Sequence, residues 1–429
     1  MSFLRVKHRG TKLEYHHTLY ASYIGYITQA IINNFPPLLF LTFQKEFEVS
    51  LERIAMMVSI NFIIQIIVDF IGAKTIDKIG YRISAIVAHG FCVLGLISLG
   101  TLPKLLENPY LGLLIAVAFN AIGGGIIEVI ISPIVESLPG KEKDKAMSLL
   151  HSFYCFGHVG VVIFSTLFFL FVGIGHWSIL AYLWMLVPLG NLILFSKVPL
   201  CTLSDHHEEN ISFDEENVSS VEKHLHREEK NIEKSRKSIF ISSMFVWLFL
   251  LMICSGAAEQ AMSQWASYFA EVGLKVSKTV GDLLGPCAFA LLMGISRALY
   301  GKMGERIKLE RAMALSSALC ILSYLTVIFS PIPFLSLIAC AICGFSVGIM
   351  WPGTFSLAAK RYRMGGTAMF AILALAGDVG CALGPAIVGF VANRTTFGLK
   401  AGMIPVIIFP IIMIVGVSMI QKMGKKKYS

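Results

Sequence analysis

Twelve long apolar stretches, separated by short polar links, run through the 429 residues of this chain. Examples are Leu19–Phe43, Ile54–Ile71, Leu111–Ile134 and Ala401–Ile420. A helix that rises ~1.5 Å per residue crosses a ~30 Å hydrocarbon layer in about 20 residues, which matches the length of these stretches. The composition agrees, with 55% hydrophobic and only 15% charged residues. The sequence therefore predicts an all-α, multi-pass membrane protein with twelve transmembrane helices.

Basic residues are distributed unevenly over the links between the apolar stretches. If the N-terminus is cytoplasmic, 29 of the 36 Lys and Arg residues fall in cytoplasmic segments and seven in outer segments. Because cytoplasmic loops carry an excess of Lys and Arg, this distribution predicts that both termini are cytoplasmic. The net charge of +9 then reflects topology, and we expect no nucleic-acid partner. We expect a monomer that lies in the lipid bilayer of a bacterial plasma membrane.

One sizeable polar segment, Lys197–Lys237, separates six spans from six. The two halves resemble each other at a period of about 220 residues, as parallel six-span repeats do. Asp77–Ile83 after span two matches Gly301–Ile307 after span eight, and Phe156–Gly160 matches Ala376–Gly380. This pattern predicts two pseudo-symmetric six-helix bundles with a substrate path between them. The expected division is a first bundle at 1–196, a cytoplasmic linker at 197–237 and a second bundle at 238–429.

The link after the second span, Ala73–Arg82, reads A-K-T-I-D-K-I-G-Y-R. It resembles the G-x-x-x-D-[RK]-x-G-[RK]-[RK] signature of the major facilitator superfamily, from which it departs at Ala73 and Tyr81. The resemblance extends over Tyr15–Lys422 and implies the major facilitator fold. A carboxylate at the end of a span can pair with basic side chains and with the positive end of a neighbouring helix. The residues expected in this charge relay and gate are Asp69, Asp77, Lys78, Arg82 and, in the second half, Arg297.

Span four and the start of span five narrow the resemblance. Gly123–Pro133 and Ala146–Gly157 are similar to the fucose permease and glucose/mannose permease branch of the superfamily. In that branch a glutamate precedes a proline by a few residues, and span five opens with an S-F-x-x-F-G pattern. The resemblance implies proton-coupled uptake of a sugar.

Three carboxyl groups, those of Glu128, Glu259 and Asp378, fall inside apolar stretches. Placing a charged side chain at the centre of a bilayer costs ~2.5–3.5 kcal/mol on insertion scales, so each needs a partner, a proton or a water-filled cavity. Glu128 shares one helical face with Asn120 and Ser132, because these residues are spaced by multiples of four. We expect Glu128 to load and release a coupling proton, and we expect Glu259 and Asp378 to take part.

His158 in span five occupies the repeat position equivalent to Asp378 in span eleven. Since histidine titrates near physiological pH, the two residues could face each other and exchange a proton. The alternative is that each forms a hydrogen bond within its own half.

Amide and aromatic side chains recur within the spans, most densely in span seven. Amides can bind vicinal hydroxyl groups, and an indole ring can cover the apolar face of a pyranose. Trp265 could instead belong to the interfacial aromatic belt. The complete set predicted to bind substrate is Tyr26, Gln29, Asn33, Asn61, Gln65, Asn120, His151, Tyr154, Glu259, Gln260, Gln264, Trp265 and Trp351.

The sequence contains no G-x-x-x-x-G-K-[ST], H-E-x-x-H or G-x-S-x-G pattern. We therefore expect neither an ATP-driven pump nor an enzyme, and no cofactor or metal. The preferred reading is a secondary transporter that moves a sugar or polyol together with protons by alternating access. A proton-driven efflux antiporter for drugs or metabolites is the first alternative, and a non-transporting membrane sensor is the second.

Overall fold

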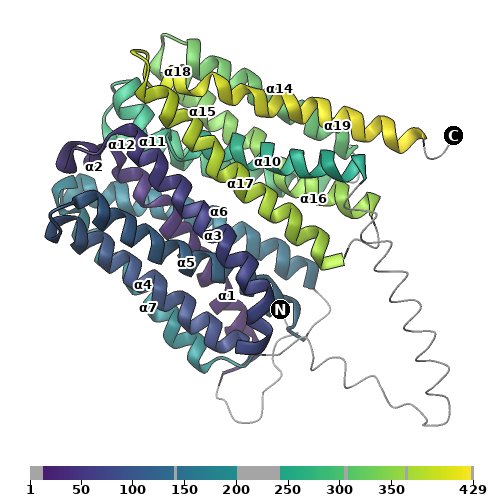
Figure 1. Ribbon diagram of the computed structural model, residues 1–429, viewed down its shortest axis with the longest axis horizontal. Helices are drawn as coiled ribbons and strands as arrows, with labels where there is room; N and C mark the ends of the chain where they lie inside the picture. Colours follow the sequence, from purple (N-terminus) through teal and green to yellow (C-terminus); the bar gives the residue numbers. More distant parts are fainter. Residues whose placement is uncertain (1–12, 140–142, 201–241, 304–307, 363–365, 427–429) are drawn as a thin grey trace.

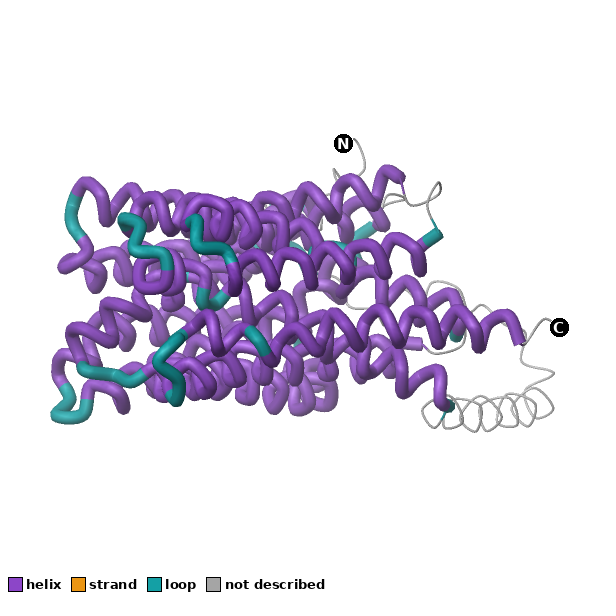
Figure 2. Tube along the Cα trace, turned by 90° about the horizontal axis from the view of Figure 1, so that it is seen from above, coloured by secondary structure: helices purple, strands orange, loops and turns teal. Residues whose placement is uncertain are grey.

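The computed structural model describes residues 13–139, 143–200, 242–303, 308–362 and 366–426. Almost all of them are helical, and the long helices lie side by side in two bundles (Figure 1). Seen at right angles, the loops gather at the two ends of the helices (Figure 2). The expected linker lies outside the described residues from position 201 to position 237.

The first bundle holds six spans. Its elements are α1 (Tyr15–Asn34), η1 (Pro36–Leu39), α2 (Phe40–Phe47), α3 (Leu51–Ile79), α4 (Tyr81–Leu105), α5 (Pro109–Glu136), α6 (Lys143–Phe171), η2 (Ile174–His176) and α7 (Trp177–Lys197).

The second bundle follows the same plan with more interruptions. Its elements are α10 (Ser243–Ser263), α11 (Ala266–Tyr268), η4 (Phe269–Gly273), α12 (Lys278–Asp282), η5 (Leu283–Cys287), α13 (Ala288–Met303), α14 (Leu309–Phe329), α15 (Pro333–Val347), α16 (Met350–Arg361), α17 (Gly366–Asn393), α18 (Leu399–Met403), η6 (Pro405–Ile407) and α19 (Ile408–Lys426).

Eleven helical stretches of the described chain are long and apolar enough to cross a membrane. The remaining span is α1, whose apolar character is interrupted by Tyr26, Gln29, Asn33 and Asn34. The expected all-α membrane architecture is thus confirmed. We call the end where α1 begins and α19 ends the terminal end, and the opposite end, which carries the link at 48–50, the far end (Figure 1).

Spans one and seven are both broken about twenty residues from their start. Span one breaks after Asn34, and span seven breaks after Ser263. Proline has no N–H, so Pro37 cannot donate to the carbonyl of Asn33 four residues earlier. A bilayer offers that carbonyl no water, so another protein group must satisfy it.

Helices α10 and α17 approach so closely that only glycine fits at their contact. A Cβ atom on Gly380 would lie 2.0 Å from the carbonyl oxygen of Ile253, and one on Gly384 would lie 2.3 Å from that of Ala257. Small residues allow this kind of backbone approach between membrane helices. The two helices therefore form one tightly packed pair.

The bundles meet along two seams. At the first seam α3 packs against α17, and at the second α6 packs against α12, η5 and α13. A site shared by the two bundles must lie between these seams.

We predict that Gly380→Ala destabilises the protein by about 1–3 kcal/mol, because the added methyl group overpacks the α10–α17 contact. Gly160→Ala in α6 is the control, since a Cβ atom there meets nothing within 4 Å. Thermal unfolding in detergent measures both variants, and equal melting temperatures would contradict the close-packing argument.

Candidate functional site

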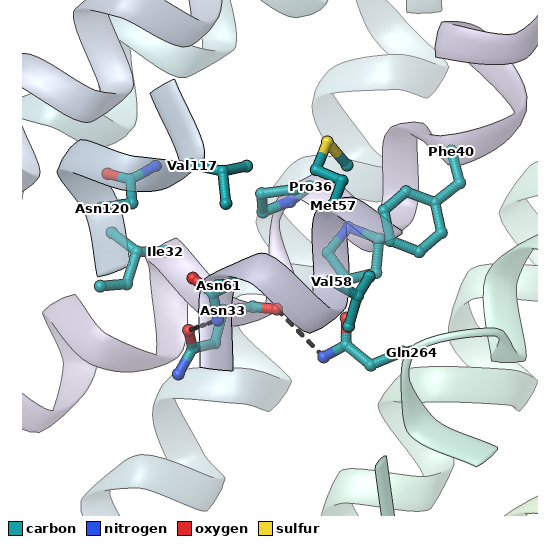
Figure 3. A pocket seen from close by; sticks show the side chains of 11 residues that line it. Ile32, Asn33, Pro36, Phe40, Met57, Val58, Asn61, Val117, Asn120 and Gln264 are labelled. Atoms are coloured by element: carbon teal, nitrogen blue, oxygen red, sulfur yellow. Dashed lines mark hydrogen bonds between the residues drawn. The ribbon is translucent and has the colours of Figure 1, made fainter. Parts of the chain in front are cut away.

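A cavity of ≈ 30 Å³ lies beside the break in span one (Figure 3). Its volume suits a single water molecule, whereas sites for small organic ligands usually enclose several hundred Å³. A solute can therefore bind here only after the surrounding helices move apart. The polar lining residues are Asn33, Asn61, Asn120 and Gln264, and the apolar ones are Ile32, Pro36, Pro37, Phe40, Met57, Val58 and Val117.

Asn33 is the centre of the polar contacts at this cavity. Its Oδ1 accepts hydrogen bonds from Asn61 Nδ2 at 3.4 Å and from Gln65 Nε2 at 3.2 Å. Its backbone oxygen, which Pro37 leaves free, accepts a bond from Gln264 Nε2 at 3.3 Å (Figure 3). The amide of span seven thus satisfies the broken backbone of span one across the two bundles.

The same polar chain continues through the second bundle to an ion pair. Gln264 Nε2 also donates to Gln260 Oε1 at 3.0 Å, and Gln260 Nε2 donates to Glu259 Oε1 at 3.3 Å. Glu259 Oε2 lies 3.6 Å from Arg297 Nη2. Arg297 also donates from Nη1 to Cys155 Sγ of the first bundle at 3.4 Å. Arg297, expected in the gate, is therefore the ion-pair partner of a predicted coupling residue.

Glu128 is held inside the first bundle by α1. Gln29 Nε2 donates to Glu128 Oε2 at 2.8 Å, while Gln29 Oε1 is buried without a hydrogen-bond partner. One turn along, the hydroxyl groups of Tyr26 and Ser132 lie 3.3 Å apart. The polar stripe expected on span four therefore faces the polar stripe of span one.

Asp378 meets Asp69 rather than His158. The side chains of Asp69 and Asp378 interact electrostatically across the first seam, and Glu128 acts on both. His158 lies on α6, at the second seam, and forms no hydrogen bond with any described residue. Asp69, expected to pair with basic residues of the following link, is thus part of a carboxyl group pair.

Other predicted binding residues have mainly protein partners. Trp265 is 0% exposed, donates from Nε1 to the carbonyl of Pro385 at 3.1 Å, and contacts the ring of Phe40. The hydroxyl of Tyr154 accepts a bond from Asn34 Nδ2 at 3.4 Å. The binding roles of Trp265 and Tyr154 stay predictions.

Asn120 and Trp351 also lie at the inner faces of the bundles. Asn120 lines the cavity, and its Oδ1 is buried without a hydrogen-bond partner. Trp351 covers Gly377, where a Cβ atom would lie 2.2 Å from the indole ring. Trp351 therefore packs on the backbone of α17 one residue before Asp378.

The residues of the expected charge relay are only partly described. Arg82 donates to the carbonyl oxygens of Phe195, Ser196 and Val198 at 2.8–3.0 Å, so it caps the end of α7. Lys78 is exposed. The side chains of Asp77 and His151 lie outside the described residues, so their predicted roles stay predictions.

The sequence reading missed a charged cluster at the far end. Lys278 Nζ donates to the backbone oxygen of Leu38 in the first bundle at 2.7 Å, and it lies 3.1 Å from Glu271 and 3.2 Å from Asp282. Asp282 is wholly buried and also accepts a bond from Thr166 of the first bundle at 3.5 Å. The four-residue spacing of Lys278 and Asp282 was the available signal. This cluster holds the bundles together at the far end.

Comparison with known proteins identifies a family and several solved structures that share the fold of this chain. A family model described as Major Facilitator Superfamily matches residues 22–385. A search among curated proteins finds no match.

Solved structures of transporters share the fold over nearly the whole chain. A D-xylose-proton symporter superposes with a TM-score of 0.76 at 12% identity, covering 95% of this chain and 97% of that one. The fucose:proton symporter of E. coli gives 0.61 at 17% identity, with 94% and 98% covered. A bacterial homolog of the human lysosomal transporter Spinster gives 0.71 at 13% identity, with 95% and 97% covered.

We predict that Arg297→Met destabilises the protein by about 3 kcal/mol, because it leaves the buried Glu259 without its ion-pair partner. Adding Glu259→Gln should restore much of that loss, since no uncompensated charge then remains. A double-mutant cycle of thermal unfolding measures the coupling, and strictly additive effects would show that the pair does not interact.

We also predict that Lys278→Met loosens the far end, because Leu38, Glu271 and Asp282 lose their shared cation. A cysteine placed at Leu39, which is wholly buried, should then react several-fold faster with a membrane-impermeant maleimide. Lys275→Met is the matched control, as Lys275 is exposed at the same end. Equal labelling of the two variants would mean that the cluster does not close the far end.

Proposed function

The chain belongs to the Major Facilitator Superfamily, and from this premise we propose that it is a secondary active transporter that moves a sugar or related small polar solute together with protons. Movement by alternating access requires a site that both bundles share and that opens to one side at a time. The polar chain from Asn33 to Arg297 meets the first requirement, because it contains side chains of both bundles.

The observation that carries the choice of solute is the group of amides at the cavity. Asn33, Asn61 and Gln264 each combine a donor and an acceptor, which suits a solute with neighbouring hydroxyl groups. Asn61 donates to the side chain of Asn33 and Gln264 donates to its backbone, and a solute with hydroxyl groups could exchange these bonds for its own without leaving the buried groups unpaired. Similarity of fold to a xylose-proton and a fucose:proton symporter is consistent with this choice.

Proton coupling is supported by carboxyl groups that have no cationic partner. Among the described residues, Glu128, Asp69 and Asp378 form no ion pair with a basic side chain. Because an unpaired charge in a bilayer is costly, these groups are suited to carry protons. Glu259 differs because it forms an ion pair with Arg297, and a carboxylate fixed in this way is suited to orient Gln260 and Gln264.

We place the terminal end in the cytoplasm, as the distribution of Lys and Arg favours. The Lys278 cluster then closes the outer side in the conformation described here. Transport requires that this cluster opens when the cytoplasmic side closes.

One observation favours a second candidate, a proton-driven efflux antiporter. Most residues around the cavity are apolar, including Phe40, Met57 and Val58, and such walls suit an amphipathic compound.

A screen with the purified protein separates the two candidates. We predict that monosaccharides or polyols raise the melting temperature whereas lipophilic cations do not, since binding to the folded state stabilises it. Asn61→Leu should weaken binding of the stabilising solute about tenfold, because one buried hydrogen bond is lost.

Asn393→Leu is the control for this variant, since Asn393 is an exposed amide outside the cavity. Counterflow of the same solute in proteoliposomes completes the test. Stabilisation by cations alone would favour the antiporter, and counterflow of no solute at all would favour a membrane sensor.

A further inference from the structure

Two aspartates meet across the first seam without a cation. Asp69 lies in α3 and Asp378 in α17, which pack against each other, and the two side chains are close enough to interact electrostatically. Asp378 is only 4% exposed. Its Oδ2 and the Oδ1 of Asp69 are both buried without a hydrogen-bond partner. The ion pairs of the described chain include neither residue.

Two carboxyl groups can form a hydrogen bond with each other only if one of them holds a proton. An ionised carboxylate is an acceptor only, so two carboxylates in contact have no donor between them. They also repel each other, and most strongly where the surroundings screen charge poorly. Two carboxyl groups that share one proton avoid both problems, as in the dyad of aspartic proteases.

The surroundings of the pair add negative charge. Glu128 of α5 acts on both aspartates, and its own Oε2 is occupied by Gln29. The next titratable group is Cys381 on α17, which in turn lies within the influence of Glu259 on α10. The other neighbouring helices, α4, α16, α18 and η6, bring no charged side chain to the pair as far as they are described.

We propose that Asp69 and Asp378 hold one exchangeable proton between the two bundles, so that the contact of α3 with α17 forms when the proton is bound and weakens when it leaves. This rests on the proposed proton coupling and names its site. The proton joins the carboxylate of one aspartate to the carboxyl group of the other. Its release leaves two negative charges that push the bundles apart at this depth.

Infrared spectroscopy of the protein in lipid tests the proposal without any solute. A protonated carboxyl group has a carbonyl stretching band that vanishes on ionisation, so the band is followed from about pH 5 to about pH 9. We expect a titrating band in the unaltered protein. Glu128→Gln removes any contribution of Glu128 to the band, and in that background Asp69→Asn and Asp378→Asn should each remove what remains, since the new amide donates to the remaining carboxylate.

The double variant should lose no more of this band than either single variant, because the proton belongs to the pair. Glu107→Gln, which changes an exposed carboxylate between α4 and α5, should keep the full band. The proposal is overturned if either asparagine variant retains the band. It is equally overturned if sodium ions at constant pH remove the band, since a metal cation would then be the ligand.

Thermal unfolding gives a second readout. We expect the melting temperature of the unaltered protein to fall as the pH rises over this range, and this fall should be smaller in the double variant, in which two amides can bond each other at any pH. An unchanged pH dependence would contradict a proton-dependent contact.

Solute-driven proton uptake in proteoliposomes separates this proposal from the proposed function. If the band behaves as expected but no solute drives proton uptake, the shared proton stands and proton-coupled transport fails. If solute-driven proton uptake persists at the unaltered rate in the double variant, transport stands and the aspartate pair is not its proton site.

Discussion

Every backbone carbonyl in a bilayer must find a donor within the protein, and the structure depends on how this is done where helices break. In the intact spans the helix satisfies itself. At the break of span one, Pro37 removes one donor, and the free carbonyl of Asn33 is satisfied by Gln264 from the other bundle. A local defect in one half thereby becomes a contact between the halves. The polar side chains that line the cavity gather around this point because the free carbonyl at the break requires a hydrogen-bond donor.

Charge is managed in three different ways along the path between the bundles. Lys278 forms ion pairs with Glu271 and Asp282 at the far end, and Arg297 forms one with Glu259 in the middle. The remaining carboxyl groups have amide or carboxyl partners only. Basic partners fix charge in place, whereas partners without charge leave the proton free to come and go. This difference separates groups that hold the structure from groups suited to coupling.

Much of the fold was readable from the sequence, because the length and apolar character of each span are set by the bilayer itself. The same cost of burial singled out Glu128, Glu259 and Asp378 as exceptional. Their partners were not readable, because these depend on how each helix is rotated and on which helix lies opposite. Asp69, expected in the charge relay, lies ten residues or about 15 Å before the end of α3, where it interacts with Asp378 of the other bundle instead.

The internal repeat also led to an incorrect prediction, namely that His158 and Asp378 face each other. His158 and Asp378 occupy matching positions in spans five and eleven, but residues related by a pseudo-two-fold axis lie on opposite sides of that axis. They therefore belong to different seams. The break in span seven also escaped notice, since no proline marks it. In contrast, Pro36 and Pro37 stood in the sequence of span one as a visible sign of its break.

The glycine contact between α10 and α17 has a mechanical consequence. Backbones that touch at Gly380 and Gly384 cannot slide or tilt independently, so the two helices turn as a single lever. Gln264 follows directly on the last residue of α10, and Asp378 lies within α17. Any movement of this helix pair that separates Gln264 from the backbone oxygen of Asn33 therefore also shifts Asp378 relative to Asp69. In a proton-coupled transporter, the binding of solute and the binding of the proton would then both change with the movement of this one helix pair, and no further residues would be needed to link the two events.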